Sequence, residues 1–464
     1  MLPLILHATG TDGGLLVNEP TVMAELFNRI GMFLSADLDS AVRRRAELCL
    51  IDSITCFSAG LGLKHFKPSA AVASSMFGNE STTGAGSFTP STIHTAYIYG
   101  QAANALDYDD TLLGHPGAPI VAAILAVGAR ENLSMDRLLR GIAAGYEAHW
   151  VLASAATPSR ERAALVRSVG VWDTVAAGIG AAVSLGKDPE FLERLVGVAL
   201  SHSLLPYTGK WYERPVPALK NNLGWAAAGA VMALDLVQAG QTGVSNPLDG
   251  STGMWRMAGS DQLDLTKTRK DLPAISRVGF KHFPACWHLQ EYLKTLASVL
   301  PQLDEREEIA AITVAGPADV EKFCQQAMLA PADVAFSLPA TFSLLISNVE
   351  PGPRWDEVAD DSPELRYKSR FAFDLSDKRS IKLETTRGRI VMSSVEVSDP
   401  HDLANRGLDE SGVVAKYERL SDPQLRSALA SGLAESDRGA AELYQAVHRL
   451  IAVAGADKHL AHPR

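Results

Sequence analysis

The sequence contains few cysteines. Among 464 residues, only Cys49, Cys56, Cys286 and Cys324 are cysteine, and no CxxC spacing occurs. A disulfide framework is therefore excluded. Cys49 and Cys56 lie seven residues apart in one helical pattern, so we expect two buried thiols on one helix face.

The sequence also lacks an excess of positive charge. It has 43 Lys and Arg residues against 53 Asp and Glu residues, a formal net charge of −10. A nucleic-acid-binding protein normally carries a basic excess or a long basic stripe, so we expect no nucleic-acid partner. An anionic ligand would need a local basic pocket that opposes this global charge.

No long apolar run is present. A membrane-spanning helix needs about 18 or more consecutive apolar residues, and the N-terminal stretch MLPLIL is short and has no basic start. We therefore expect neither a membrane span nor a signal peptide, and we take the cytoplasm as the default location. Hydrophobic residues still make up 47% of the chain and charged residues 21%, which is typical of globular proteins and excludes a disordered chain.

Helical patterns dominate the first half of the chain. Apolar residues recur with a period near 3.6 between residues 39 and 59, and Gly60 is a plausible stop. Similar patterns predict helices at 91–106, 118–129, 136–155, 171–185, 190–204 and 225–239. Several of these are rich in Ala and Gly, which let helix axes approach closely, so we expect a compact bundle. Strand signals are almost absent before residue 300.

The pattern changes after residue 268. Residues 309–314, 380–386 and 389–397 have the β-branched content and partial alternation of strands, whereas the tail returns to helical spacing. We therefore predict a mainly α fold. Residues 1–268 and 403–464 would form one large all-helical domain, and residues 269–402 a smaller, inserted α+β lid domain.

The densest polar cluster is the stretch DYDDTLLGHPG, which begins at Asp107. Three carboxylates within four positions (Asp107, Asp109 and Asp110) repel one another at neutral pH, so they need a cation, a metal, a helix N-terminus or a proton nearby. A solvated acidic loop with one aspartate as a helix cap is the alternative interpretation. The adjoining Thr111 and His115 add donors and acceptors, which favours a functional loop.

The same letters allow two other interpretations. DYDDT matches the Asp-x-Asp-x-Thr of haloacid-dehalogenase-type phosphotransferases, but that chemistry needs the motif at the end of a buried strand, and residues 99–106 have a helical pattern. A metal site is weakly supported, because His115 has no partner three or four residues further on.

Two further clusters carry cationic side chains. Lys220 precedes a small-residue helix, where a lysine is unfavourable unless it is exposed or faces an anion. The stretch FKHFPACWH, residues 280–288, places Lys281, His282 and His288 among aromatic residues where the mixed segment begins. These groups would line a cleft between domains, or belong to an aromatic hinge with surface histidines.

Several segments together resemble the MmgE/PrpD family, which includes 2-methylcitrate dehydratase and cis-aconitate decarboxylase. They follow one another in consistent order over nearly the whole chain: 45–60, 105–111, 115–119, 145–147, 220–227, 280–288, 335–339 and the tail around Lys416. The resemblance implies a helical domain, an inserted α+β lid, an active site between them and a homodimer. It also implies a reaction on small di- or tricarboxylates without a metal or an organic cofactor.

The resemblance implies site residues as well. Asp107, Thr111 and His115 match the family's active-site loop, and Lys281 and His288 match the start of its lid. Lys220 corresponds to a family site lysine, although its distance to the following glycine is one residue shorter than expected.

The sequence departs from the decarboxylase branch at three positions. Trp172, followed by Asp173, and Cys286 stand where that branch has histidine, and Asn104 replaces a histidine that often precedes the Ala-Leu-Asp of the motif. These departures argue against cis-aconitate decarboxylase itself and leave the substrate open.

We therefore expect a cofactor-independent hydro-lyase. The expected catalytic residues are Asp107, His115 and His288, and the expected substrate-binding residues are Thr111, Lys220, Lys281, Trp172 and Asp173, with no metal. An epimerase or isomerase, a decarboxylase of a related dicarboxylate, and a non-catalytic carboxylate-binding protein are the alternatives.

Overall fold

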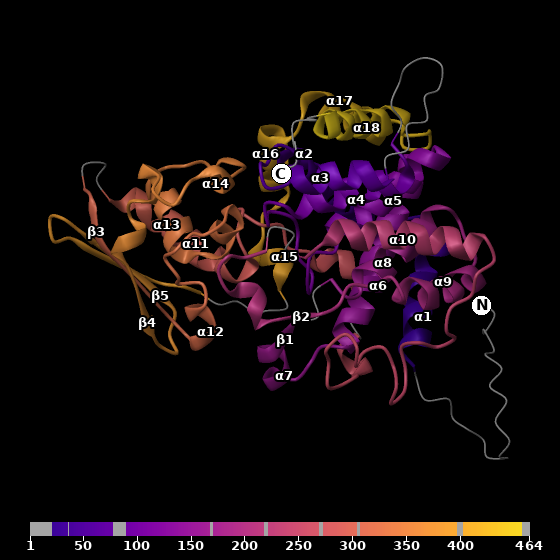
Figure 1. Ribbon diagram of the computed structural model, residues 1–464, viewed down its shortest axis with the longest axis horizontal. Helices are drawn as coiled ribbons and strands as arrows, with labels where there is room; N and C mark the ends of the chain where they lie inside the picture. Colours follow the sequence, from indigo (N-terminus) through magenta and orange to yellow (C-terminus); the bar gives the residue numbers. More distant parts are fainter. Residues whose placement is uncertain are drawn as a thin grey trace, which may run out of the picture.

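The computed structural model describes residues 21–35, 37–77, 90–167, 170–217, 221–268, 272–303, 307–396 and 402–456. The N-terminal apolar stretch and Lys220 lie outside these ranges. The described chain is mostly helical and contains one small mixed sheet, as the fold class predicted. The helices pack in layers on one side of the molecule, and the sheet lies at the opposite end (Figure 1).

The predicted helices of the first half lie close to their predicted positions, and three more that were not predicted accompany them in the described chain: α1 (Val22–Ser35), α3 (Lys67–Phe77) and α7 (Arg160–Leu165). The predicted helices are α2 (Ser40–Leu61), α4 (Thr92–Asn104), α5 (Gly117–Glu131), α6 (Met135–Ala155), α8 (Asp173–Ser184), α9 (Pro189–Leu200) and α10 (Leu223–Gln238). The predicted helix at 190–204 is shorter than expected, because α9 ends at Leu200. Two strands of two residues each, β1 (Val166–Arg167) and β2 (Tyr207–Thr208), pair between them.

Helix α2 shows how the sequence sets its limits. Asp39 caps the N-terminus, since its side chain accepts a hydrogen bond from the Ala41 backbone N–H over 2.9 Å. Cys49 and Cys56 are both buried within it, as predicted. The predicted stop at Gly60 is wrong, because the helix continues to Leu61 and Gly62 is its C-cap. Gly60 instead lies where α2 and α4 approach most closely.

Replacing Gly60 tests this close packing. A methyl group at this position would lie 1.9 Å from the backbone carbonyl oxygen of Ala102 in α4. We expect Gly60→Ala to lower the free energy of unfolding by about 1–3 kcal/mol or more. The methyl group would collide with the Ala102 backbone, which cannot move aside as a flexible side chain can. Urea denaturation measures the loss. Gly62→Ala is the matched control, since a methyl group there meets nothing within 4 Å; equal losses in the two variants would contradict the close approach.

The sheet consists of β3 (Ile309–Gly316), β4 (Phe371–Leu375), β5 (Ser380–Thr385) and β6 (Ile390–Ser394) in the order β4-β3-β5-β6. The strands β3 and β4 are parallel, and the other two pairs are antiparallel. Three of these strands were predicted, and β4 was not. The helices along this stretch are α11 (Gln290–Val299), α12 (Ala318–Glu321), α13 (Leu338–Ile346) and α14 (Arg354–Glu357).

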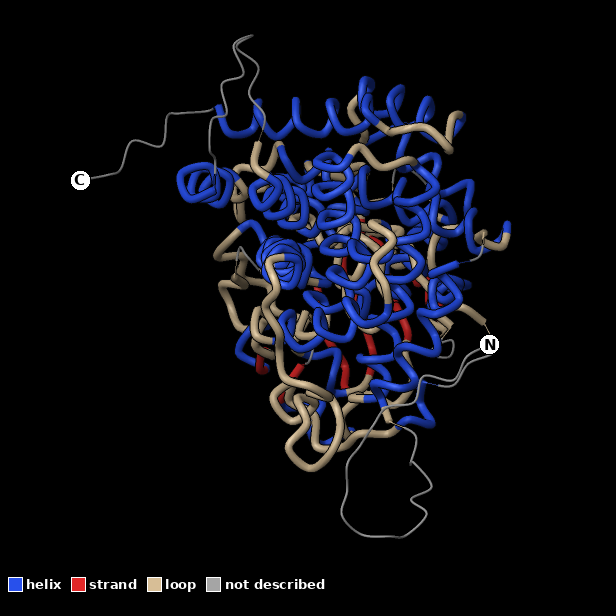
Figure 2. Tube along the Cα trace, turned by 90° about the vertical axis from the view of Figure 1, so that its right-hand side faces the viewer, coloured by secondary structure: helices blue, strands red, loops and turns tan. Residues whose placement is uncertain are grey.

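The tail is helical, as predicted. It contains α15 (Leu403–Arg406), α16 (Glu410–Leu420), α17 (Pro423–Ala434) and α18 (Ala441–Ala456). These last three helices cover α2 and α3 from the beginning of the chain, at the top of Figure 1. The turned view shows the same helices above the bundle, with the strands behind it (Figure 2).

The buried apolar side chains form two separate clusters. The first draws its members from Val22 to Phe280 and again from Leu403 to Ile451, whereas the second draws them from Phe283 to Val395. We call the first group the helical body and residues 283–395 the mixed segment. The chain leaves the helical body and returns to it at neighbouring points. The Leu408 N–H there donates to the Phe280 carbonyl oxygen over 2.8 Å. The predicted domain limits stay a prediction.

None of the described helices combines the length and the apolar character that crossing a membrane requires.

Candidate active site

The polar motif lies in a buried loop between two helices. Helix α4 ends at Asn104 and α5 begins at Gly117, and Asp107, Asp109 and Asp110 each expose no more than 2% of their surface. The interpretation as a solvated acidic loop is therefore wrong. The phosphotransferase interpretation is wrong too, because the motif follows a helix and not a buried strand.

The loop is tightly turned, and it is hydrogen-bonded to the segment where the chain passes from the helical body to the mixed segment. Asp107 and Leu113 adopt the left-handed conformation, with φ of 53° and 52°, and Gly114 has a φ of 152°. Thr111 and Gly279 exchange two backbone hydrogen bonds of 2.9 and 3.0 Å. This bridge holds the loop beside the segment that carries Lys281.

Asp107 is paired with Lys281. The Lys281 ammonium donates to the Asp107 carboxylate Oδ1 over 2.7 Å and to its backbone carbonyl oxygen over 2.8 Å. Lys281 is completely buried. Burial would lower its pKa, but the neighbouring carboxylates of Asp107 and Asp109 outweigh burial and raise the pKa. Lys281 therefore supplies a fixed positive charge inside the protein.

Asp109 is held by three different groups. Both of its carboxylate oxygens accept hydrogen bonds of 3.1 Å from the Asn104 amide. The His115 Nδ1 lies 3.3 Å from Oδ1, and the Lys281 ammonium lies 4.0 Å from it. Burial would raise the pKa of Asp109, but His115 and Lys281 lower it below its ordinary value. Asp109 is therefore an ionised carboxylate at neutral pH.

Asp110 is satisfied in another way. The Tyr146 hydroxyl and the Gly117 backbone N–H, the first of helix α5, both donate to its carboxylate. Burial, and next the negative charge of Asp52, raise the pKa of Asp110 to about 8. At neutral pH this carboxyl group is therefore mostly protonated, and it contributes little charge to the loop.

The raised pKa of Asp110 makes stability depend on pH. The folded protein keeps a proton on Asp110 that the unfolded chain loses above about pH 4. The stability that Asp110 contributes is therefore complete below about pH 4 and is lost as the pH rises to about 8. We expect the free energy of unfolding to fall by roughly 1 kcal/mol per pH unit from this group across that window. Asp110→Asn, which cannot ionise, should flatten the profile.

Urea denaturation between pH 5 and pH 8 compares the two proteins. Asp374→Asn is the matched control, because Asp374 is exposed and its replacement removes the same charge. If wild type and Asp110→Asn lost stability in parallel over this range, Asp110 would not hold the proton.

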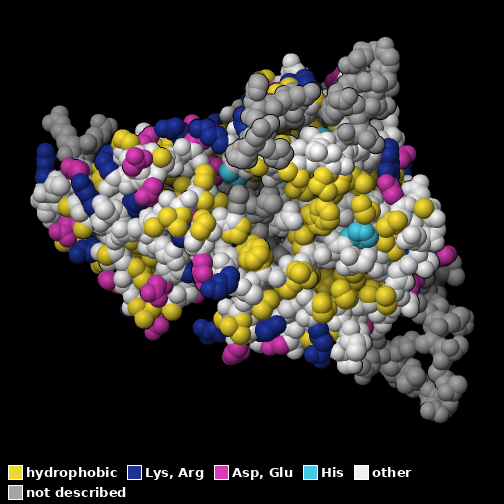
Figure 3. Space-filling model, viewed as in Figure 1, with side chains coloured by type: hydrophobic (Ala, Val, Ile, Leu, Met, Phe, Trp, Pro, Cys, Tyr) yellow, Lys and Arg dark blue, Asp and Glu magenta, His cyan; other side chains and the backbone are white. Residues whose placement is uncertain are grey.

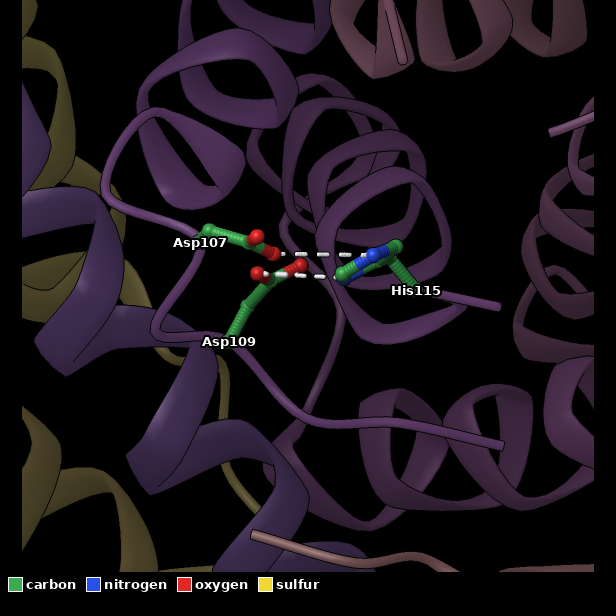
Figure 4. Close-up of side chains that lie close together, drawn as sticks. All are labelled: Asp107, Asp109 and His115. Atoms are coloured by element: carbon green, nitrogen blue, oxygen red, sulfur yellow. Dashed lines mark ion pairs between the residues drawn. The ribbon is translucent and has the colours of Figure 1, made fainter. Parts of the chain in front are cut away.

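His115 faces two carboxylates. Its Nε2 lies 3.6 Å from Asp107 Oδ1, while Nδ1 faces Asp109 (Figure 4). A proton on either ring nitrogen is thus within reach of a carboxylate. The side chain is 16% exposed, more than either aspartate, so the imidazole is the part of the cluster nearest to solvent.

The same three side chains are close enough to hold a metal ion, since their ligand atoms all lie within 4.8 Å of one another. The Lys281 ammonium already provides a cation at this point and donates to Asp107. A divalent ion would therefore have to displace or face a buried positive charge.

The other predicted site residues have varied surroundings. Thr111 lies in the loop, but its hydroxyl donates to the Gly114 carbonyl oxygen over 3.0 Å. His288 is exposed and stacks on Phe323 of the mixed segment, with ring centroids 6.0 Å apart. Lys220 lies outside the described residues. The roles of all three stay predictions.

Trp172 and Asp173 are both buried at the start of α8. The Asp173 carboxylate Oδ1 lies 2.9 Å from the Nδ1 of His149 in α6. Their predicted role in substrate binding stays a prediction.

Sequence reasoning missed several residues that support the loop. Asn104, noted only as a departure from the family, holds Asp109 and accepts a 3.2 Å hydrogen bond from Asn221. The Lys416 ammonium donates to Asp52 and to the Tyr108 backbone carbonyl, 2.8 and 2.6 Å away. The Lys-aromatic setting of the tail was the only sequence signal for this contact.

A hollow at the far end of the mixed segment contains none of these residues. It is lined by Pro317, Lys378, Arg379 and their neighbours, beside β4 and β5. The predicted crevice between the helical body and the mixed segment stays a prediction.

These observations describe a mainly helical protein in which an imidazole faces two buried carboxylates, one of which is paired with a buried lysine. The chain matches the model of the MmgE/PrpD N-terminal domain over residues 31–265, just over half of its length. The protein belongs to the MmgE/PrpD family, and this membership indicates a dehydratase-like enzyme. Comparison with curated proteins finds no match.

Proposed function

We propose that the protein is a cofactor-independent hydro-lyase that acts on a small di- or tricarboxylate such as 2-methylcitrate. One observation carries the proposal: His115 lies within 3.6 Å of two buried carboxylates, and one of these is paired with Lys281 from 174 residues further along the chain. Acid, base and cation are thus gathered at one point, next to the exposed edge of the imidazole.

Elimination of water needs these three kinds of group. A base removes the proton alpha to a carboxylate, an acid protonates the departing hydroxyl, and a cation stabilises the charge that develops on the carboxylate. His115 is the proposed acid–base group, because imidazole exchanges protons near neutral pH. Asp107 orients the ring or takes the proton itself.

Lys281 has an electrostatic task in this proposal. Its ammonium offsets part of the negative charge of Asp107 and Asp109, which would otherwise repel an approaching substrate carboxylate. The overall charge of −10 repels such a substrate, so this local charge is needed. The mixed segment, which carries His288, is the proposed lid, and Lys220 and Thr111 are the proposed further contacts with substrate carboxylates.

The test is a substrate screen with purified protein. 2-Methylcitrate, citrate, cis-aconitate and related diacids are incubated in D₂O and followed by mass spectrometry. A hydro-lyase releases or adds water, whereas an epimerase introduces deuterium without changing the composition. Asp107→Asn is the matched inactive variant. No conversion and no deuterium exchange with any carboxylate, together with thermal stabilisation by one of them, would replace the enzyme with a carboxylate-binding protein.

The predicted homodimer belongs to the same proposal. Trp225 and Met232, two turns apart on α10, are 43% and 37% exposed. Apolar side chains gather over this helix on the face shown in Figure 3, whereas charged side chains are more frequent over the mixed segment. An exposed apolar face supports contact with a second copy. Light scattering of the wild type and of Trp225→Glu measures the mass in solution.

A further inference from the structure

A buried histidine outside the predicted site contacts the backbone of the active-site loop. His149 lies on α6 and is 2% exposed. Its Nε2 lies 2.8 Å from the carbonyl oxygen of Leu112, and its Nδ1 lies 2.9 Å from the carboxylate of Asp173. The ring thus connects the first residue of α8 to the loop between α4 and α5.

The chemistry of the two contacts sets their direction. A carbonyl oxygen only accepts, so the His149 Nε2 carries a proton and donates it to Leu112. Asp173 is the first residue of α8, where the helix dipole favours a negative charge. Its carboxylate lies against the other edge of the ring, 2.9 Å from Nδ1, as an electrostatic contact without hydrogen-bond geometry.

Leu112 lies at the point where the loop turns toward His115. Its N–H donates to the Gly114 carbonyl over 3.3 Å, and Leu113 between them adopts a φ of 52°. In so tight a turn, the orientation of the Leu112 peptide determines where His115 starts. A rotation of this peptide would move the imidazole away from Asp107.

We propose that His149 and Asp173 are a positioning pair: His149 binds the Leu112 carbonyl, and the pair thereby keeps the His115 imidazole facing its two carboxylates. The inference rests on the proposed function, because it assigns the pair a task for that site. It gives Asp173 a role through His149 and the loop, in place of direct contact with substrate. A buried pair that only fills the core is the competing explanation.

Two conservative variants separate the two contacts of the ring. In His149→Gln the side-chain amide takes the place of Nε2 and keeps the donor to Leu112, whereas in His149→Asn it takes the place of Nδ1 and keeps the contact with Asp173. We expect His149→Asn to lower kcat by about 10²-fold with little change in KM, as a displacement of about 1 Å does. His149→Gln should retain most of the activity.

A second measurement does not need turnover. Carbethoxylation of His115 by diethyl pyrocarbonate, followed by peptide mass spectrometry, reports how the imidazole is held. We expect His149→Asn to change the His115 reaction rate several-fold, and His149→Gln to match the wild type. Urea denaturation measures the stability of both variants, so that a general loss of folding is recognised.

The outcomes distinguish the two proposals. If the wild type converts no substrate, the proposed function fails, but the labelling rates still test the positioning pair. If the wild type is active and the Gln and Asn variants lose activity equally, in step with their stability, the pair is structural and the inference is overturned. The same holds if the Asn variant keeps both wild-type turnover and the wild-type labelling rate.

Discussion

Replacing Lys281 with methionine is expected to lower the free energy of unfolding by about 3–5 kcal/mol, as the removal of one partner from a buried ion pair does. The methionine side chain fills a similar volume but leaves the carboxyl groups of Asp107 and Asp109 without the ammonium that lies 2.7 and 4.0 Å away. Urea denaturation at neutral pH measures the difference.

A second substitution shows that charge is the cause. In the double variant Lys281→Met with Asp107→Asn, one of the two carboxylates is removed as well, and we expect about 1–3 kcal/mol of the loss to be recovered. Lys294→Met is the matched control, since Lys294 is one-third exposed and pairs with Glu291. Its removal should cost less than about 1 kcal/mol. Equal losses for the two lysines would contradict a charged pair at Asp107.

The helices were predictable because each presents a long, unbroken pattern. Helices α8 and α10 consist largely of small residues and are mostly buried. Each is a long stretch without proline, which was enough to locate it. Strand β4 was missed because it pairs in parallel with β3, from a distant part of the chain, and no neighbouring turn marks that pairing. The pairing of β1 with β2 rests on two residues each, which is too short for any periodicity.

The needs of the polar motif were predictable, but its partners were not. Three crowded carboxylates required a cation, a metal, a helix N-terminus or a proton, and the fold supplies three of these: Lys281 for Asp107, and the Gly117 N–H of α5 and a proton for Asp110. The choice of partners is a long-range property, since Lys281 lies 174 residues from Asp107. Such contacts leave no local pattern in the sequence.

The support of the loop was hidden for the same reason. His149 lies in the buried second half of α6, and a lone histidine among buried residues indicates a core histidine as readily as a positioning residue. The bond between Lys416 and Asp52 joins residues 364 positions apart. Only the fold brings these two parts of the chain together beside the loop.

Replacing His115 with alanine is expected to lower turnover of the carboxylate substrate by about 10²–10⁴-fold, the contribution of one general acid or base. The loop should remain folded, because the Asp107–Lys281 pair and the bridge from Thr111 to Gly279 do not involve the imidazole. Steady-state kinetics on the substrate found in the screen measures kcat, and circular dichroism compares the folds.

The pattern of kcat and KM identifies the role of His115. A group that only binds the substrate raises KM and leaves kcat unchanged, whereas an acid–base group lowers kcat. His448→Ala is the matched control, because His448 is also partly buried but lies in α18, outside the loop. Full activity of both His115→Ala and Asp107→Ala would exclude the proposed mechanism, since no other imidazole in the described part of the chain forms an ion pair with these two carboxylates.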